Sequence, residues 1–196
     1  VGEDDLATAL TLVLATAPGN TLENGATLSV NATALSAENT DYDSATFPKT
    51  VTFTAGQGHG ATQTVSFDPA SDTLLEGDET VSLSLTNGAL LTASGQTTHL
   101  VTIRDADTAT IAFQQAATTV GEDDPATALT LVLATAPGNT LENGTTIAVS
   151  ATLGSAETAD YDSAPFPKTV TFTARQGHGA TQTGAFVPAS DNLIEG

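Results

Sequence analysis

The sequence contains no cysteine, methionine or tryptophan, and only four of its 196 residues are lysine or arginine. Without cysteine, the chain has neither a disulfide framework nor thiolate chemistry. The few basic residues face 23 aspartates and glutamates, so the formal net charge is −19. This charge excludes nucleic acid as an expected partner, because a phosphate backbone is bound by a basic surface. Anionic membrane surfaces are disfavoured for the same reason.

Long apolar segments are also missing. No run of about 18 apolar residues occurs, so we expect no insertion of this segment into a membrane. Residues 1–3 lack the basic start and apolar core of a signal peptide. Because the chain opens and ends inside a repeated pattern, we expect it to be a piece of a longer protein.

The chain repeats itself with a period that suits one β-sandwich. Residues 1–5, Val-Gly-Glu-Asp-Asp, recur at 120–124, which is 119 positions later. About four in five aligned positions are identical up to the last residue. We therefore predict two tandem domains, residues 1–107 without their leading strand and residues 108–196 without their last two strands. We expect the flanking parts of the longer protein to supply the missing strands. Alternatively, neighbouring molecules supply them by β-strand addition.

The local pattern predicts an all-β fold. Short segments alternate between polar and apolar residues and are separated by turn signals such as Asn24-Gly25. The strands expected in the first repeat are residues 8–14, 27–34, 49–54, 61–67, 80–85 and 97–104, and residues 110–113 begin the next repeat. No segment keeps a period of 3.6, so essentially no helix is expected.

Acidic residues gather where these strands begin and end. Four carboxylates lie in the eight residues 72–79, immediately before a predicted strand. With so few basic residues, their counter-charge is expected to be a cation bound from solution. Calcium suits such loops because it takes six to eight oxygen ligands and tolerates irregular geometry. The alternative is that these acids only solvate turns.

Five motifs in order resemble a Calx-β domain, a repeat found in sodium–calcium exchangers, integrin β4 and many bacterial surface proteins. They are Val1-x-Glu3, Asp41-Tyr42, Val51-Thr52-Phe53, Asp72-x-x-x-Glu76-Gly77-Asp78-Glu79-Thr80 and residues 102–107. The resemblance implies immunoglobulin-like Greek-key β-sandwich repeats in tandem. It also implies calcium at one pole of each sandwich, near the junction with the next domain.

By match to this family pattern, the candidate calcium ligands fall into one set per repeat. In the first repeat they are Glu3, Asp41, Asp72, Glu76, Glu79, Asp105 and Asp107. In the second repeat they are Glu122, Asp160, Asp191 and Glu195. Ser71 and Ala106 stand where the calcium sensors of the family carry further acids, which favours one or two ions per repeat. Asp68 is left out because its counterpart is Val187.

The sequence gives little support for histidine metal ligands or for a hydrolytic active site. His59 and His178 lie in equivalent Gly-His-Gly turns, where a histidine is usually exposed to solvent. No Gly-x-Ser-x-Gly motif occurs, and a sugar-cleaving pair of acids would lack a tryptophan platform. We therefore expect no enzyme activity.

These observations predict a calcium-binding structural repeat of a large extracellular adhesin or surface filament, secreted to a bacterial cell surface. The expected partners are neighbouring repeats, or other copies of the chain in a filament, with calcium stiffening the pole between repeats. Two alternatives stay open: a regulatory calcium sensor, and a non-catalytic accessory domain of a secreted enzyme.

Overall fold

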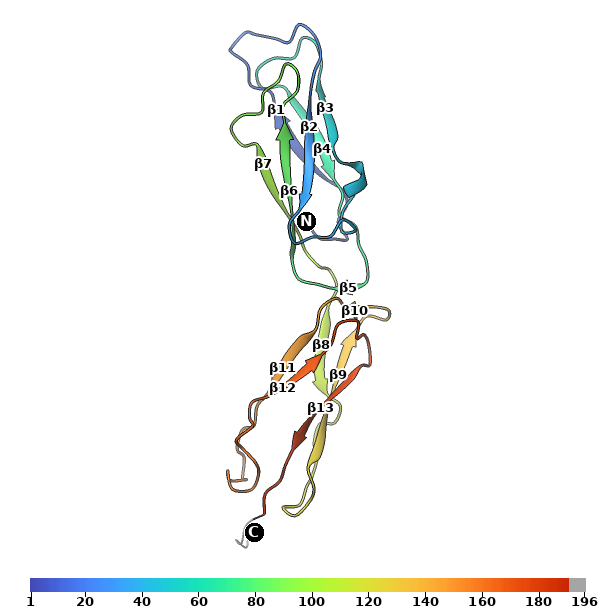
Figure 1. Ribbon diagram of the computed structural model, residues 1–196, viewed down its shortest axis with the longest axis vertical. Coiled ribbons are helices and arrows are strands. Elements are labelled where there is room, and N and C mark those ends of the chain that lie inside the picture. Colours follow the sequence, from blue (N-terminus) through green and yellow to red (C-terminus); the bar gives the residue numbers. More distant parts are fainter. Residues whose placement is uncertain (191–196) are drawn as a thin grey trace. The chain divides into compact units, whose positions relative to one another are not determined.

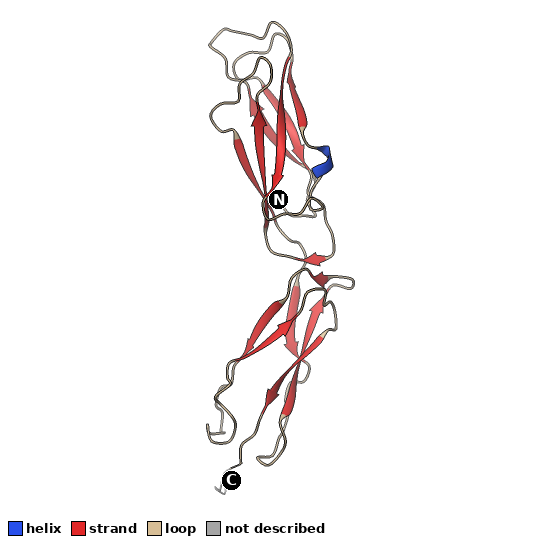
Figure 2. Ribbon diagram, viewed as in Figure 1, coloured by secondary structure: helices blue, strands red, loops and turns tan. Residues whose placement is uncertain are grey.

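The computed structural model describes residues 1–190, and nearly all of its regular structure is β-strand (Figures 1 and 2). The prediction of an all-β chain is therefore confirmed. A single turn of 3₁₀ helix, η1 (Ser44–Thr46), is the helical element among the described residues. Residues of the first repeat form six strands in the first unit: β1 (Thr8–Val13), β2 (Ala26–Ala34), β3 (Lys49–Phe53), β4 (Thr62–Phe67), β6 (Glu79–Thr86) and β7 (Thr98–Ile103).

The chain folds into two compact units. The first unit comprises Val1–Asp72 and Gly77–Ala106, and the second comprises Thr73–Glu76 and the chain from Asp107 onward. Whether residues 1–107 and 108–196 are the natural domains stays a prediction. The second unit contains β5 (Leu74–Leu75), β8 (Ala109–Phe113), β9 (Thr127–Thr135), β10 (Thr140–Leu141), β11 (Thr145–Val149), β12 (Lys168–Phe172) and β13 (Thr181–Phe186).

In the first unit, two antiparallel sheets share one core, as in an immunoglobulin-like sandwich. One sheet has the strand order β3-β2-β6-β7, and the other pairs β1 with β4. Strand alternation points every second side chain inward, and the innermost are Phe53, Phe67 and Val81, each at most 1% exposed. Burying one such side chain contributes about 1.5–3 kcal/mol, so contacts between the two sheets hold the unit together.

The second unit repeats part of this arrangement. Its sheets are β13-β9-β8 and β11-β12, and a short parallel pair joins β5 to β10. Leu133 and Phe172 are fully buried in its core. The two-residue strands β5 and β10 were not among the predicted strands, because so short a pairing leaves no periodic pattern in the sequence.

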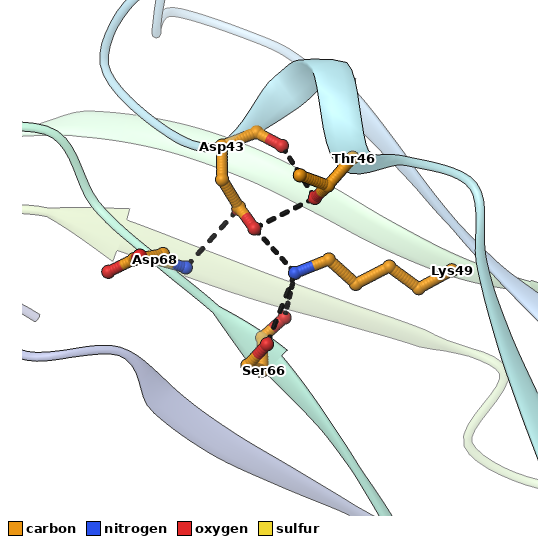
Figure 3. A network of polar contacts seen from close by, with 5 residues as sticks. All are labelled: Asp43, Thr46, Lys49, Ser66 and Asp68. Carbon is orange, nitrogen blue, oxygen red and sulfur yellow. Dashed lines mark hydrogen bonds and ion pairs between the residues drawn. The ribbon is translucent and has the colours of Figure 1, made fainter.

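A polar network anchors the loop between β2 and β3 to the edge of β4 (Figure 3). The Asp43 carboxylate accepts hydrogen bonds from the Lys49 ammonium at 2.5 Å, the Thr46 hydroxyl at 2.8 Å and the Asp68 backbone N–H at 3.2 Å. Lys49 also donates to the Ser66 carbonyl at 2.7 Å. Burial by itself raises the pKa of Asp43, but these donors outweigh it and lower the pKa below its usual value. The network thus fixes the loop that carries Asp41.

The Asp43 network predicts a dependence of stability on acid. Because the pKa of Asp43 is lower in the folded state, its contribution is fully present above the unfolded pKa of about 3.9. It is lost as the pH falls below that value through the folded pKa. We expect Asp43→Asn to lower the free energy of unfolding of the first unit at pH 7 by about 1–2 kcal/mol.

Native-state hydrogen exchange of the β6 amides measures this change, and the β9 amides of the second unit serve as the control within the same molecule. Glu23→Gln, a neutralisation at an exposed position, provides the matched variant. Equal loss in both variants, or no loss in β6, would contradict the assignment.

Candidate metal centre

Acidic residues of the first repeat gather at one end of the four-stranded sheet β3-β2-β6-β7. Glu79 is the first residue of β6, and it stands opposite Ile103, the last residue of β7. Because these strands are antiparallel, the start of one and the end of the other meet at the same edge. The loop after β2 begins there too, since the Leu35 N–H donates to the Thr80 carbonyl at 3.0 Å. Acids distant in sequence are thereby brought to one end of the sheet.

The first of two carboxylate groups consists of Glu3, Asp105 and Asp107. Glu3 is only 7% exposed. Its backbone N–H donates to the Arg104 carbonyl at 3.0 Å, and its carboxylate accepts the Ala106 N–H at 3.2 Å. This parallel contact between the start of the chain and the end of β7 places Glu3 beside the Asp-Ala-Asp segment that follows the strand.

The second group consists of Asp41, Glu76 and Glu79. Asp41 is 6% exposed, and its carboxylate accepts hydrogen bonds from the Glu38 N–H at 2.5 Å and the Thr40 hydroxyl at 3.1 Å. Its backbone carbonyl accepts the Ala70 N–H at 2.8 Å. These contacts hold Asp41 in one position although it lies in a loop.

Distances and burial in both groups suit a hard divalent cation. In each group, one oxygen per residue lies within 4.8 Å of the others. Calcium–oxygen bonds of about 2.3–2.6 Å allow two ligand oxygens to be about 5 Å apart across the ion. One oxygen each of Glu79 and Asp107 has less than 1 Å² exposed to solvent. The residues present therefore fit a calcium ion, which carboxylate oxygens bind preferentially.

Electrostatics favour the same interpretation. Three carboxylates held this closely repel one another, and a bound divalent cation relieves the repulsion. The pKa of the neighbouring Tyr42 is raised above its usual value. Burial is the largest cause, and the negative charges of Asp41 and Asp43 raise this pKa further. One nearby cationic side chain, Lys49, is held by Asp43 and Ser66.

The remaining predicted ligands are placed differently. Asp72 is exposed and belongs to neither group. Glu122 is exposed, and Asp160 is half-buried and accepts the Glu157 N–H at 2.6 Å, as Asp41 accepts that of Glu38. Asp191 and Glu195 lie outside the described residues. Metal binding at all eleven positions stays a prediction, as does its location at a junction between repeats.

The division into two groups was not visible in the sequence, which suggested one set of ligands per repeat. The division into two groups depends on the register of β6 and β7, and this register is determined only when the two strands pair in the folded chain.

Both turn histidines, His59 and His178, are exposed and lie in neither group. No helix among the described residues is both long and apolar enough to cross a bilayer.

Comparisons with known proteins give structural similarity alone. No family model matches the sequence, and no curated protein does. The solved calcium binding domain CBD12 of CALX1.1 aligns with a TM-score of 0.43 and 14% identity, over 95% of this chain and 71% of that chain. CBD12 of CALX1.2 gives 0.42 and 13%, over 99% and 73%. The apo-form Calx CBD1 domain gives 0.43 and 16%, over 54% and 88%. With TM-scores below 0.5, these similarities do not show what this chain binds.

Proposed function

We propose that the first repeat, residues 1–107, is a calcium-binding β-sandwich. The observation that carries this proposal is the pair of three-carboxylate groups at one end of its four-stranded sheet, each with oxygens within 4.8 Å. Glu3, Asp105 and Asp107 would hold one ion, and Asp41, Glu76 and Glu79 would hold the other. The bound cation supplies positive charge and ligand positions. The chain supplies carboxylates already fixed by backbone contacts, as at Glu3 and Asp41.

We further propose that this unit is a structural repeat of an extracellular adhesin or surface filament. Two nearly identical copies in tandem support a role in which the protein supplies length. Millimolar calcium outside cells would fill even weak sites. A strong excess of negative charge keeps such chains soluble and apart. The proposal includes no catalytic role, and its expected partners are further repeats of the same kind.

A regulatory sensor is the second candidate function, favoured by the resemblance to Calx-β domains of exchangers. The two functions require different affinities. A structural module works with a Kd of about 10⁻⁴–10⁻³ M, whereas a sensor needs about 10⁻⁷–10⁻⁵ M. We expect calorimetric titration of the chelator-treated chain to give the weaker range. A Kd of about 10⁻⁵ M or lower would instead favour the sensor.

Calcium is expected to raise the melting temperature of the first unit. A ligand bound only by the folded state at ten times its Kd stabilises by about 1.4 kcal/mol. For a domain of this size, that corresponds to a rise of about 5–10 °C. Differential scanning calorimetry with calcium and with excess chelator measures the difference. Identical melting in both conditions would refute the calcium site.

Neutralising one buried ligand tests which carboxylates are involved. We expect Glu3→Gln to reduce the calcium-dependent rise in melting temperature. In chelator, the variant should be at least as stable as the original chain, because one repulsive charge is gone. The matched control is Glu122→Gln, the same substitution at the equivalent position of the second repeat, where the side chain is exposed. Equal calcium responses in both variants would show that Glu3 does not bind the ion.

A further inference from the structure

An identical sequence adopts strands of different length in the two units. Residues 8–16 and Thr127–Thr135 both read Thr-Ala-Leu-Thr-Leu-Val-Leu-Ala-Thr. In the second unit all nine residues form β9, whereas in the first unit β1 ends at Val13. Each strand pairs on one side with an equivalent partner, β4 or β13. The difference must therefore arise at the other edge.

That other edge carries a strand in the second unit. β8 pairs antiparallel with β9, with Ala109 opposite Thr135 and Phe113 opposite Leu131. The three residues by which β9 exceeds β1, 133–135, are those opposite residues 109–111. Among residues 1–190, no strand pairs with the corresponding edge of β1. Pairing with β8 thus accounts for the extra length of β9.

Side chains of β1 are more exposed than their counterparts in β9, because β1 lacks a strand on its outer edge among the described residues. Val13 is 63% exposed, whereas its counterpart Val132 is half-buried. Leu12 is half-buried, whereas Leu131 is 3% exposed. An apolar strand edge exposed in this way is a site where a further strand can add.

A groove of about 750 Å³ lies beside this edge in the first unit. Nine leucines line it together with smaller and polar residues, and they include Leu12 and Leu14 next to the edge, Leu83 and Leu85 of β6, and Leu91. In the second unit, Ile111 stands opposite Leu133 and packs against the core. The same register in the first unit would bring this isoleucine opposite Leu14, a residue that lines the groove.

The backbone of the edge is oriented for pairing. Leu14 uses its N–H and C=O toward the β4 side, bonding to Ala61 at 2.8 Å and Gly60 at 2.9 Å. Because these groups alternate along an antiparallel strand, those of Val13 and Ala15 point to the other edge. In the second unit the equivalent edge is used, since the Gln114 N–H donates to the Thr130 carbonyl at 2.8 Å.

We propose that the outer edge of β1 is an acceptor site for an extended segment with the sequence of residues 108–114, Thr-Ala-Thr-Ile-Ala-Phe-Gln. The segment binds antiparallel in the register of β8, with Ile111 opposite Leu14 and Ala112 opposite Val13. Main-chain hydrogen bonds supply affinity, and insertion of the isoleucine into the leucine-lined groove supplies specificity. This site is independent of the proposed calcium sites.

A synthetic peptide of residues 107–116 tests the proposal with the complete 196-residue chain. Fluorescence anisotropy of the labelled peptide should give saturable binding with one peptide per chain. Hydrogen exchange should show the Ala15 amide slowed about tenfold or more by the peptide. Ala134, its counterpart already paired with β8, is the internal control and should not change.

Two variants make the test specific. A peptide with Ala112→Pro loses the N–H that faces Val13 and should bind at least about tenfold more weakly. In the protein, Val13→Pro removes an outer-edge donor without removing a donor to β4. It should abolish peptide binding while the β6 amides stay protected.

Three results would overturn the proposal. These are no binding of the original peptide, equal binding of its proline variant, and slowed exchange elsewhere without slowing at Ala15. Sedimentation of the chain without peptide tests whether a second copy of the chain occupies the outer edge of β1 instead. A dimer with Ala15 already protected would show that a second copy covers this edge, and the peptide site would be rejected.

Discussion

Packing between two β-sheets holds the acidic residues of the first repeat at one end of its four-stranded sheet. The apolar side chains of β3, β4 and β6 meet in one core, with Phe53, Phe67 and Val81 at its centre. This core fixes the strands, and the strands fix where their loops begin and end. Carboxylates that repel one another can then be held within 4.8 Å, because the free energy of apolar burial opposes the repulsion.

The proposed calcium binding would be linked to stability through the same strands. Glu79 belongs to β6, and Asp105 and Asp107 directly follow β7. A cation bound to these residues stabilises the folded positions of both strand ends, which the core also requires. The Asp43–Lys49 network performs a related task without metal, since it ties the loop of Asp41 to β4 (Figure 3).

Comparison of the two units shows how strongly a strand depends on its neighbours. The nine residues shared by 8–16 and Thr127–Thr135 have one intrinsic propensity, yet they form strands of six and nine residues. An added strand supplies hydrogen-bond partners and covers apolar side chains, and both effects extend regular structure. The exposed edge of β1 and its groove follow directly from the lack of such a neighbour among the described residues.

The sequence by itself determined the repeat and the longer strands of the first repeat, because alternation and turn residues are local properties. The strands of residues 8–14 and 49–54, for example, were predicted to within one residue of β1 and β3. It also indicated which acids lie at strand ends. Only the tertiary structure decided that Glu3 joins Asp105 and Asp107, that Asp41 joins Glu76 and Glu79, and that Asp72 stays apart. These groupings depend on strand register and sheet order, which arise from contacts between residues far apart in the chain.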